Sequence, residues 1–123
     1  MQRKTGIIVF AHGSRQDAGN ESLIQFVAKL RNQLGIELIE PAFMEFGQPT
    51  IPAAIHKLVK QGCNHIFGYA LFFVPGAHLQ EDIPAIFAAT LKNSPGITWE
   101  ISPPLLADPL LLEFVADRIK TGK

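Results

Sequence analysis

Short runs of apolar residues alternate with longer stretches of helical spacing along the whole chain. Residues 6–11 (GIIVFA) form a continuous, β-branched run, which is typical of a strand buried on both faces of a sheet. The next apolar positions have the spacing of one helical face: Leu23, Phe26, Val27, Leu30 and Leu34. Gly35 stands where a helix C-cap glycine is expected. The pattern therefore predicts a strand and a helix at the start of the chain.

Three further strand-like segments follow: residues 36–43 (IELIEPAF), 65–73 (HIFGYALFF) and 97–101 (ITWEI). The proline near the end of the first of these, Pro41, indicates a strand at the edge of the sheet. Thr50 is expected to cap a helix that Gly62 closes, and another helix is predicted over residues 80–91.

Asp108 and Pro109 have the residue types of an N-cap and a first helical position. They predict a final amphipathic helix whose apolar positions are Leu112, Phe114, Val115 and Ile119. The order strand–helix, repeated four times, implies a parallel sheet with helices on both faces and right-handed crossovers. No repeat or linker interrupts it, so residues 1–123 are expected to form one α/β domain.

Composition narrows the classes of function. The chain of 123 residues is 47% hydrophobic and 18% charged, with 11 basic and 11 acidic residues. A net charge of zero argues against a general binder of nucleic acid or of an anionic membrane, and the hydrophobic content argues against disorder. Cys63 is the only cysteine in the sequence, which excludes an intramolecular disulfide and a cysteine-rich zinc site. No apolar run approaches a signal sequence or the ~18 residues of a membrane span, so a cytoplasmic location is expected.

The histidines differ in their expected positions. Ligands of open α/β sheets bind beyond the carboxyl ends of the strands, where the strand order reverses. His12 follows the first strand and His78 lies in the loop after the third. With the strand order 2-1-3-4 these strands are neighbours, and the two imidazoles share one edge and can share a metal ion. Either histidine alone has a structural alternative, as a turn or helix-cap residue, whereas His56 and His65 are expected to be solvated or structural.

Other polar residues are expected at the same edge. Glu45 and Gln48 follow the second strand, where such side chains are usually solvated, so Glu45 is a secondary candidate ligand. Arg15 is either a partner for an acidic substrate group or an exposed surface arginine. The apolar residues of these loops have two possible roles, packing in the core or forming the floor of a pocket for a flat ring. They are Phe43, Phe46, Phe72, Phe73 and Pro75. The spacing matches no zincin, P-loop or dinucleotide fingerprint.

Three segments together resemble the small chelatases of the CbiX type. They are IIVFAHGSRQDAGN (7–20), FMEFGQPTIPAAI (43–55) and LFFVPGAHLQEDIP (71–84), and the resemblance covers about residues 6–87. Their specific features are HGSR after the first strand, a Glu with a following Pro after the second, and G-x-H before E-D-I-P after the third. The resemblance implies a chelatase-like, flavodoxin-like three-layer fold with a four-stranded parallel sheet of order 2-1-3-4, in a chain half the length of the two-domain chelatases.

The resemblance also implies an activity, the insertion of a divalent metal into sirohydrochlorin, a flat tetrapyrrole that carries many carboxylates. It places the metal ligands on His12 and His78. The substrate contacts fall on Gln48 and on the loop Phe73, Val74, Pro75, Gly76, Ala77 and His78.

Imidazole suits this reaction because it binds Co²⁺, Fe²⁺ or Ni²⁺ and, with an ordinary pKa of ~6.5, accepts a proton at neutral pH. We therefore expect His12 and His78 to bind the metal ion. The ion is a substrate of the reaction, and Co²⁺ is the ion we expect first. His12 also takes a pyrrole proton, and Glu45 assists as ligand or proton relay. Arg15 and the helix N-termini attract the substrate's carboxylates, and no organic cofactor is needed.

Other functions and a second subunit remain open at this point. The chain could be a metal carrier without catalysis or a flavodoxin-like interaction module, and a phosphotransfer enzyme is disfavoured because no arginine cluster is present. The half-length chain and the charge-poor composition predict a homodimer. Phe46, Phe73 and Val74 are candidates for its covered surface or for the pocket wall, with core packing as the alternative.

Overall fold

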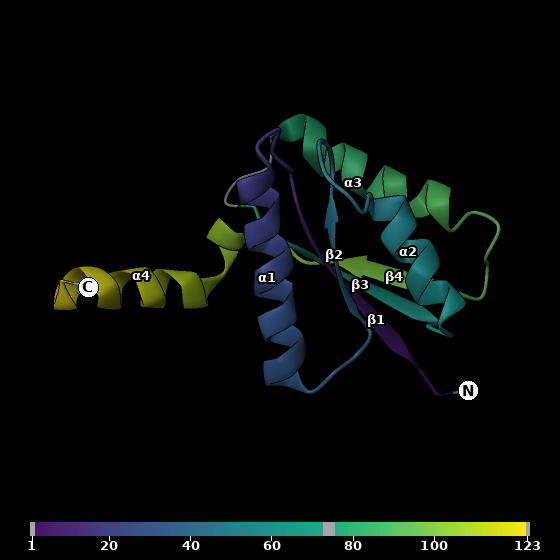
Figure 1. The fold of residues 1–123 in the computed structure, drawn as a ribbon, viewed down its shortest axis with the longest axis horizontal. Helices are drawn as coiled ribbons and strands as arrows, with labels where there is room; N and C mark the ends of the chain where they lie inside the picture. The colour runs from purple at the N-terminus through teal and green to yellow at the C-terminus, as the bar shows by residue number, and fades with distance from the viewer. Residues whose placement is uncertain (1, 73–75, 123) are drawn as a thin grey trace.

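Four parallel strands form the centre of the structure (Figure 1). The computed structural model describes residues 2–72 and 76–122, with the backbone alone for residues 77–79. The strands are β1 (Thr5–Ala11), β2 (Ile39–Phe43), β3 (His65–Ala70) and β4 (Thr98–Ile101). Their order is β2-β1-β3-β4, so the predicted order 2-1-3-4 is confirmed and β2, with its proline, lies at an edge. The chain adds β2 on one side of β1 and then β3 and β4 on the other side, so the strand order switches between β1 and β3.

The helices alternate with the strands. They are α1 (Asp17–Leu34), α2 (Ile51–Lys60), α3 (Ala77–Thr90) and α4 (Pro109–Thr121), with the short 3-10 helix η1 (Leu105–Ala107) before the last. The expected caps are present: Gly35 ends α1 with φ 65°, and the Thr50 hydroxyl accepts a hydrogen bond from the Ala53 amide at 3.2 Å. Asp108 accepts one from the Leu110 amide at 2.9 Å. None of the helices in the described part of the chain is long and apolar enough to span a bilayer.

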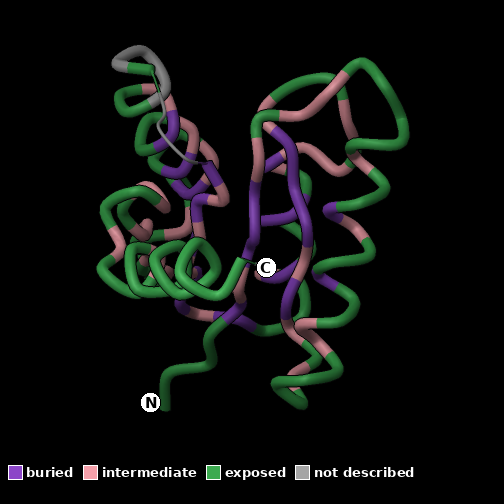
Figure 2. Tube along the Cα trace, turned by 90° about the vertical axis from the view of Figure 1, so that its left-hand side faces the viewer, coloured by how far each residue is buried: buried purple, intermediate pink, exposed green. Residues whose placement is uncertain are grey.

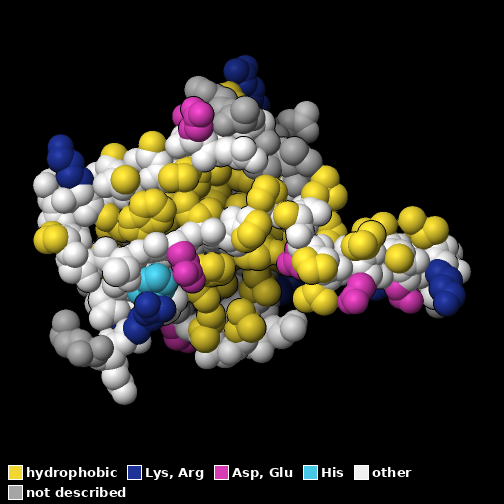
Figure 3. Space-filling view, turned by 180° about the vertical axis from the view of Figure 1, so that it is seen from behind, with side chains coloured by type: hydrophobic (Ala, Val, Ile, Leu, Met, Phe, Trp, Pro, Cys, Tyr) yellow, Lys and Arg dark blue, Asp and Glu magenta, His cyan; other side chains and the backbone are white. Residues whose placement is uncertain are grey.

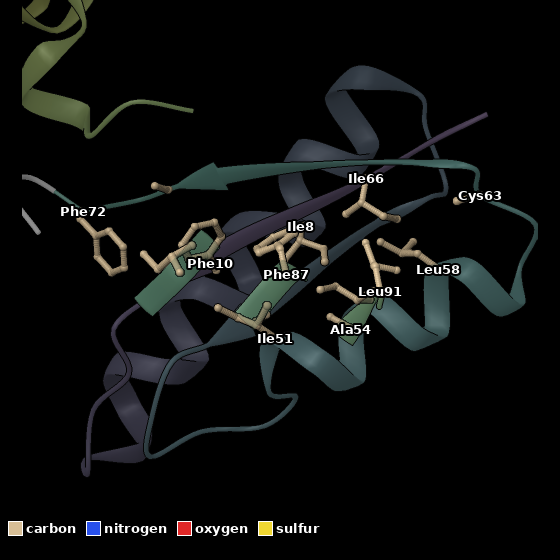
Figure 4. Packing of buried hydrophobic residues seen from close by; sticks show 14 residues of the cluster. Ile8, Phe10, Ile51, Ala54, Leu58, Cys63, Ile66, Phe72, Phe87 and Leu91 are labelled. Atoms are coloured by element: carbon tan, nitrogen blue, oxygen red, sulfur yellow. The ribbon is translucent and has the colours of Figure 1, made fainter. Parts of the chain in front are cut away.

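The larger core cluster lies between the sheet and the pair α2 and α3 (Figure 4). Ile8 and Phe10 of β1 and Phe87 of α3 are fully buried there, and the rings of Phe10 and Phe87 are 6.3 Å apart. Gly68 of β3 makes this packing possible, because a Cβ at that position would come within 2.8 Å of the Phe87 ring. This face of the sheet is closed by two helices.

The opposite face carries a smaller cluster. Val9 and Ile39 of the sheet pack against Leu23 and Val27 of α1. Side chains of β1 thus alternate between the two clusters, with Ile8 and Phe10 on one face and Val9 on the other, as the period of two in a strand requires. The predicted buried strand is confirmed. In the tube view, the purple buried segments lie between helices on both sides (Figure 2).

Several predicted bounds were wrong. β2 begins at Ile39, three residues after the predicted start, because the Ile36 amide still bonds the Arg31 carbonyl of α1 and the Ile39 amide turns back to Glu37. β3 ends at Ala70, which pairs with Phe10 near the end of β1, and the predicted end at residue 73 lies outside the described residues. α3 begins three residues before the predicted start, since Gly76 rather than a later residue is its N-cap.

The last helix differs most from expectation. α4 extends away from the rest of the molecule and covers neither face of the sheet (Figure 1). Its described side chains are exposed almost throughout. The sequence correctly predicted an amphipathic helix here, but its apolar side has no partner within the described structure of this one chain.

Candidate functional site

His12 lies at the carboxyl end of β1, exposed to solvent, as predicted. The backbone ties it to the loop after β2: the Glu45 amide donates to the His12 carbonyl at 2.9 Å, and the Met44 amide donates to the Ala11 carbonyl at 3.0 Å. Gly13 has φ 100°, and a Cβ there would overlap the Glu45 carbonyl oxygen. Glycine after His12 is therefore what lets the Glu45 backbone approach so closely.

Asn20 joins the same two loops through its side chain. Its Oδ1 accepts from the Ser14 amide at 2.9 Å, and its Nδ2 donates to the carbonyls of Ser14 at 2.9 Å and Phe46 at 2.6 Å. Sequence analysis missed this residue. The available signal was an amide side chain in the first turn of a helix, six residues after a serine in a glycine-containing turn.

Arg15 and Phe46 form a pair at the rim. The Arg15 guanidinium carbon lies 4.6 Å from the centre of the Phe46 ring, which is a cation–π contact. Phe46 is 50% exposed and has φ 55°, so it is neither core nor the floor of an enclosed pocket. The contact holds a positive charge at the carboxyl edge of the sheet.

Glu45 and Gln48 are both exposed beside this pair. The Gln48–Pro49 peptide bond is cis, and the Pro49 carbonyl accepts from the Phe43 amide at 3.0 Å. The loop after β2 is thus folded back onto the end of its own strand. The structure brings together four of the predicted residues at one rim: His12, Arg15, Glu45 and Gln48.

The loop after β3 leaves the sheet at the same edge. β1 and β3 are neighbours, and the Leu71 amide donates to the Phe10 carbonyl at 2.9 Å. Gly76 caps α3 and is exposed, and Ala77 and His78 are the first two residues of that helix. The backbone of His78 is therefore in the first turn of α3, after the loop from β3. Phe73, Val74 and Pro75 lie outside the described residues.

Of the two alternatives left open for the aromatic residues of these loops, core packing holds for Phe43 and Phe72. Phe43 is 1% exposed and packs with the α1 cluster, and Phe72 is 9% exposed, with its ring edge-on to Phe10 at 5.6 Å. Both are core residues because they continue the inward positions of their strands. A cavity of about 110 Å³ beside Phe72 and Gln80 is smaller than the ~300 Å³ at which ligand pockets begin. This cavity is therefore too small for a large flat ligand, and at this edge of the sheet such a ligand would lie on the open rim.

The other two histidines lie elsewhere, as predicted. His56 is exposed within α2. His65 is buried at the amino end of β3, where its Nδ1 bonds the Thr98 hydroxyl at 2.6 Å and its Nε2 is 3.8 Å from a Glu100 oxygen. Cys63 is buried in the same region, and burial raises the pKa of its thiol. These groups are structural.

The described residues of the rim form an open surface site rather than an enclosed pocket. An exposed imidazole, a carboxylate and a guanidinium can bind an ion, move a proton and attract an anion. Among the side chains that the structure describes, which exclude that of His78, no three acidic, histidine or cysteine residues form a ready cation site.

Comparison with known proteins identifies relatives along almost the entire chain. The CbiX family model matches residues 6–122, which is further than the predicted resemblance over residues 6–87. The chain is 38% identical over 115 residues to the chloroplastic sirohydrochlorin ferrochelatase of Arabidopsis thaliana, covering 94% of this chain and 51% of the relative. It is 30% identical to the sirohydrochlorin cobaltochelatase of Sulfurisphaera tokodaii, covering 94% of this chain and 91% of that protein.

A solved structure agrees with this. The sirohydrochlorin chelatase SirB from Bacillus subtilis subspecies spizizenii, in complex with cobalt, superposes with a TM-score of 0.82 at 28% identity. The match covers 96% of this chain and 50% of that one. The chain thus spans about half the length of the Arabidopsis and Bacillus proteins and nearly all of the Sulfurisphaera one.

Proposed function

The chain belongs to the CbiX family, and from this premise we propose that it is a sirohydrochlorin chelatase, which inserts a divalent metal ion into the tetrapyrrole. Relatives named as ferrochelatase and as cobaltochelatase align with 94% of the chain, including the segments after the first three strands. The observation that carries the proposal is the exposed His12 at the carboxyl end of β1, held beside Glu45 and next to the strand that leads to His78.

In this reaction the metal is a substrate. The ion loses water ligands, two pyrrole N–H groups each lose a proton, and the ring nitrogens take up the metal. His12 and His78 bind the incoming ion through their imidazoles, which leaves other coordination positions free for the ring nitrogens. Once the ion has passed to the ring nitrogens, the freed imidazole of His12 accepts one pyrrole proton and passes it to solvent. Glu45 acts as a further ligand or as the relay that carries the second proton to solvent. The open rim supports this role because both ring and water must reach the same histidine.

The substrate's carboxylates need cationic and hydrogen-bonding partners. Arg15 is supported in this role by its contact with Phe46, which keeps the guanidinium at the rim. Gln48 lies on the same rim, and the segment from Phe73 to His78 completes the proposed binding surface. Electrostatic attraction at this edge does not require a basic protein, because it acts over a Debye length of about 10 Å.

Co²⁺ is the metal we propose first, with Fe²⁺ and Ni²⁺ as alternatives. Nitrogen ligands bind all three ions, so the supply of each metal in the cell decides which one is inserted as much as its affinity does. The product would then enter cobalamin or sirohaem synthesis. A cytoplasmic location and a homodimer belong to the same proposal, since two copies have the combined length of relatives such as the Arabidopsis protein.

An absorbance assay tests the proposal. Purified protein is mixed with sirohydrochlorin and with Co²⁺, Fe²⁺ or Ni²⁺ in turn, and the spectral change of the tetrapyrrole is followed. We expect the rate to fall by about 100-fold or more in His12→Ala and His78→Ala, the range of a lost acid–base group. His56→Ala is the matched control and keeps the rate, because His56 is exposed on α2, away from the rim.

The pH profile gives a second measurement. The rate of metal insertion should fall as the pH is lowered from about 8 to about 5, because protonated imidazole neither binds a metal nor accepts a proton. A protein that binds Co²⁺ without changing the tetrapyrrole spectrum above the uncatalysed rate is a carrier, and the proposal fails. Wild-type rates in both rim-histidine variants would contradict the assigned site but not the activity.

A further inference from the structure

Phe46 has a backbone conformation that is unfavourable for a residue of its type. Its φ is 55°, in the left-handed region, and it is the one residue other than glycine with a positive φ in the part of the chain that the structure describes. A bulky aromatic residue rarely adopts this conformation, because its Cβ then crowds the neighbouring carbonyl group. Glycine adopts it without this strain. A phenylalanine that is kept in such a conformation calls for a structural or a functional reason.

Hydrogen bonds of the loop backbone hold this conformation in place. The Phe46 carbonyl accepts a hydrogen bond from the Asn20 Nδ2 atom at 2.6 Å, and the Glu45 amide donates to the His12 carbonyl at 2.9 Å. Because these bonds use only backbone atoms of residues 45 and 46, they would be available to any residue at position 46. They explain how the strain is tolerated, but they do not explain why the residue is aromatic.

The Phe46 side chain lies on the polar rim and belongs to neither of the two core clusters. The other exposed phenylalanines among the described residues, Phe26 and Phe114, are part of larger apolar surfaces. Phe26 lines an apolar groove beside α1. Phe114 is on α4, and Figure 3 shows hydrophobic side chains along this projecting helix and on the body beside its root. Phe46 lies instead beside the exposed side chains of Arg15 and Glu45, so packing against other apolar residues does not account for it.

Arg15 covers one face of the Phe46 ring. The guanidinium carbon lies over the ring, 4.6 Å from its centre. An aromatic ring has two faces, and the 50% exposure of Phe46 leaves apolar ring surface open to solvent. Flat conjugated ligands stack on such surfaces, and guanidinium groups pair with carboxylates. The pair therefore offers an aromatic surface and a positive charge side by side, which matches a flat ring with carboxylates at its edge.

We propose that Phe46 determines specificity for the tetrapyrrole: its ring stacks against the plane of the macrocycle while Arg15, on its other face, pairs with a carboxylate at the edge. This inference rests on the proposed function and adds a residue that recognises the flat ring itself. The two residues together select for flatness and for negative charge, and a ligand with only one of these properties binds more weakly. The strained backbone of Phe46 is then retained because the ring that it carries binds the substrate.

Binding of metal-free sirohydrochlorin is the first test, because it does not require metal insertion. The absorbance change of the tetrapyrrole is titrated with each protein to give its Kd. Phe46→Tyr keeps a flat ring and should bind as the wild-type protein does, whereas Phe46→Leu keeps an apolar side chain without a ring and should raise the Kd about tenfold. Phe114→Leu is the matched control, because Phe114 is also exposed and has Arg118 over its ring at 4.9 Å. It should leave the Kd unchanged.

Thermal unfolding separates a binding role from a structural one. Phe46→Ala and Phe46→Gly lose the same ring, but only the glycine variant is free of the left-handed strain. Its unfolding midpoint should therefore be about 4 °C above that of the alanine variant. Both variants should bind sirohydrochlorin equally weakly, because binding depends on the ring. An affinity that rises with the midpoint from the alanine to the glycine variant would assign Phe46 a structural role and overturn the proposal.

Steady-state kinetics with Co²⁺ complete the test. Phe46→Leu should raise the KM for sirohydrochlorin about tenfold and change kcat by less than about twofold, because stacking stabilises the bound substrate and the transition state alike. Arg15→Gln should weaken binding mainly at low salt, since salt screens its charge, whereas the loss in Phe46→Leu should be the same at low and high salt. If Phe46→Leu binds as tightly as Phe46→Tyr, the role of Phe46 is wrong and the chelatase proposal stands. If the wild-type protein does not bind sirohydrochlorin, both proposals fail.

Discussion

Asn20 shows how one side chain can organise the rim. It satisfies three backbone groups from two loops, and these loops carry His12 on one side and Glu45 on the other. Gly47 packs closely against it, since a Cβ there would come within 3.0 Å of the Asn20 Nδ2 atom. The proposed chemistry thus rests on a residue that does not itself face the substrate, so Asn20 is a positioning residue.

Replacement of Asn20 by Ala should affect activity more than stability. Water can solvate the three freed backbone groups at this partly exposed site, so we expect a loss of about 1 kcal/mol in the free energy of unfolding. The displaced loops should lower kcat for chelation by about tenfold, because small misplacements of reacting groups are costly. Asn32→Ala, on the exposed surface of the same helix, is the control: it should leave kcat unchanged, and it should not lower the free energy of unfolding because Ala favours the helix more than Asn. Equal effects of the two substitutions, in urea unfolding and in the absorbance assay, would contradict the positioning role.

For single residues, the sequence predicted where in the fold a side chain lies better than it predicted which groups that side chain contacts. His12 follows a buried strand, and that alone sends it to the carboxyl edge. The contact of Arg15 with Phe46 and the bonds of Asn20 depend on loop conformations with positive φ, at Gly13 and Phe46, which no periodicity encodes. Phe43 and Phe72 were ambiguous because an aromatic residue at a strand end looks the same whether it faces the core or the rim.

At the scale of elements, α2 depends on its cap. The Thr50 hydroxyl accepts from the Ala53 amide at 3.2 Å, and Thr50 also bridges to Phe43 at the end of β2. The helix therefore starts at a fixed point relative to the loop that carries Glu45 and Gln48.

Thr50→Ala should lower the free energy of unfolding by about 1 kcal/mol, because a free amide loses its acceptor at the start of the helix. Thr50→Ser keeps a hydroxyl at the same position and should restore most of the loss. Urea unfolding of the three proteins at one fixed concentration measures the difference. If the serine variant were as unstable as the alanine variant, packing of the threonine methyl group rather than capping would be responsible.

The elements themselves were predictable where burial fixes them. β1 alternates between two buried clusters, and β2, with its proline, is at the edge because a proline cannot donate to a ladder bond. The bounds were less predictable, since the end of α1 extends its hydrogen bonds to Ile36 and delays β2. The pattern of α4 correctly indicated a helix with one apolar side, but hydrophobic spacing cannot say which molecule covers that side.

In the whole molecule, the rim and the root of α4 are neighbours. The Leu105 amide of η1 bonds the Phe72 carbonyl, directly before the loop that leads to His78. The segment that leads to α4 is therefore hydrogen-bonded to the chain just after β3, on the carboxyl side of the sheet.

The proposed homodimer also predicts how heat stability depends on protein concentration. Unfolding of a dimer separates its chains, so a tenfold rise in protein concentration stabilises it by about 1.4 kcal/mol. For two chains of this size, that corresponds to a rise of about 3 °C in the unfolding midpoint. Scanning calorimetry of the protein at three concentrations measures this. A midpoint that stays constant over a hundredfold range of concentration would mean that folding is complete within one chain, and it would contradict the homodimer.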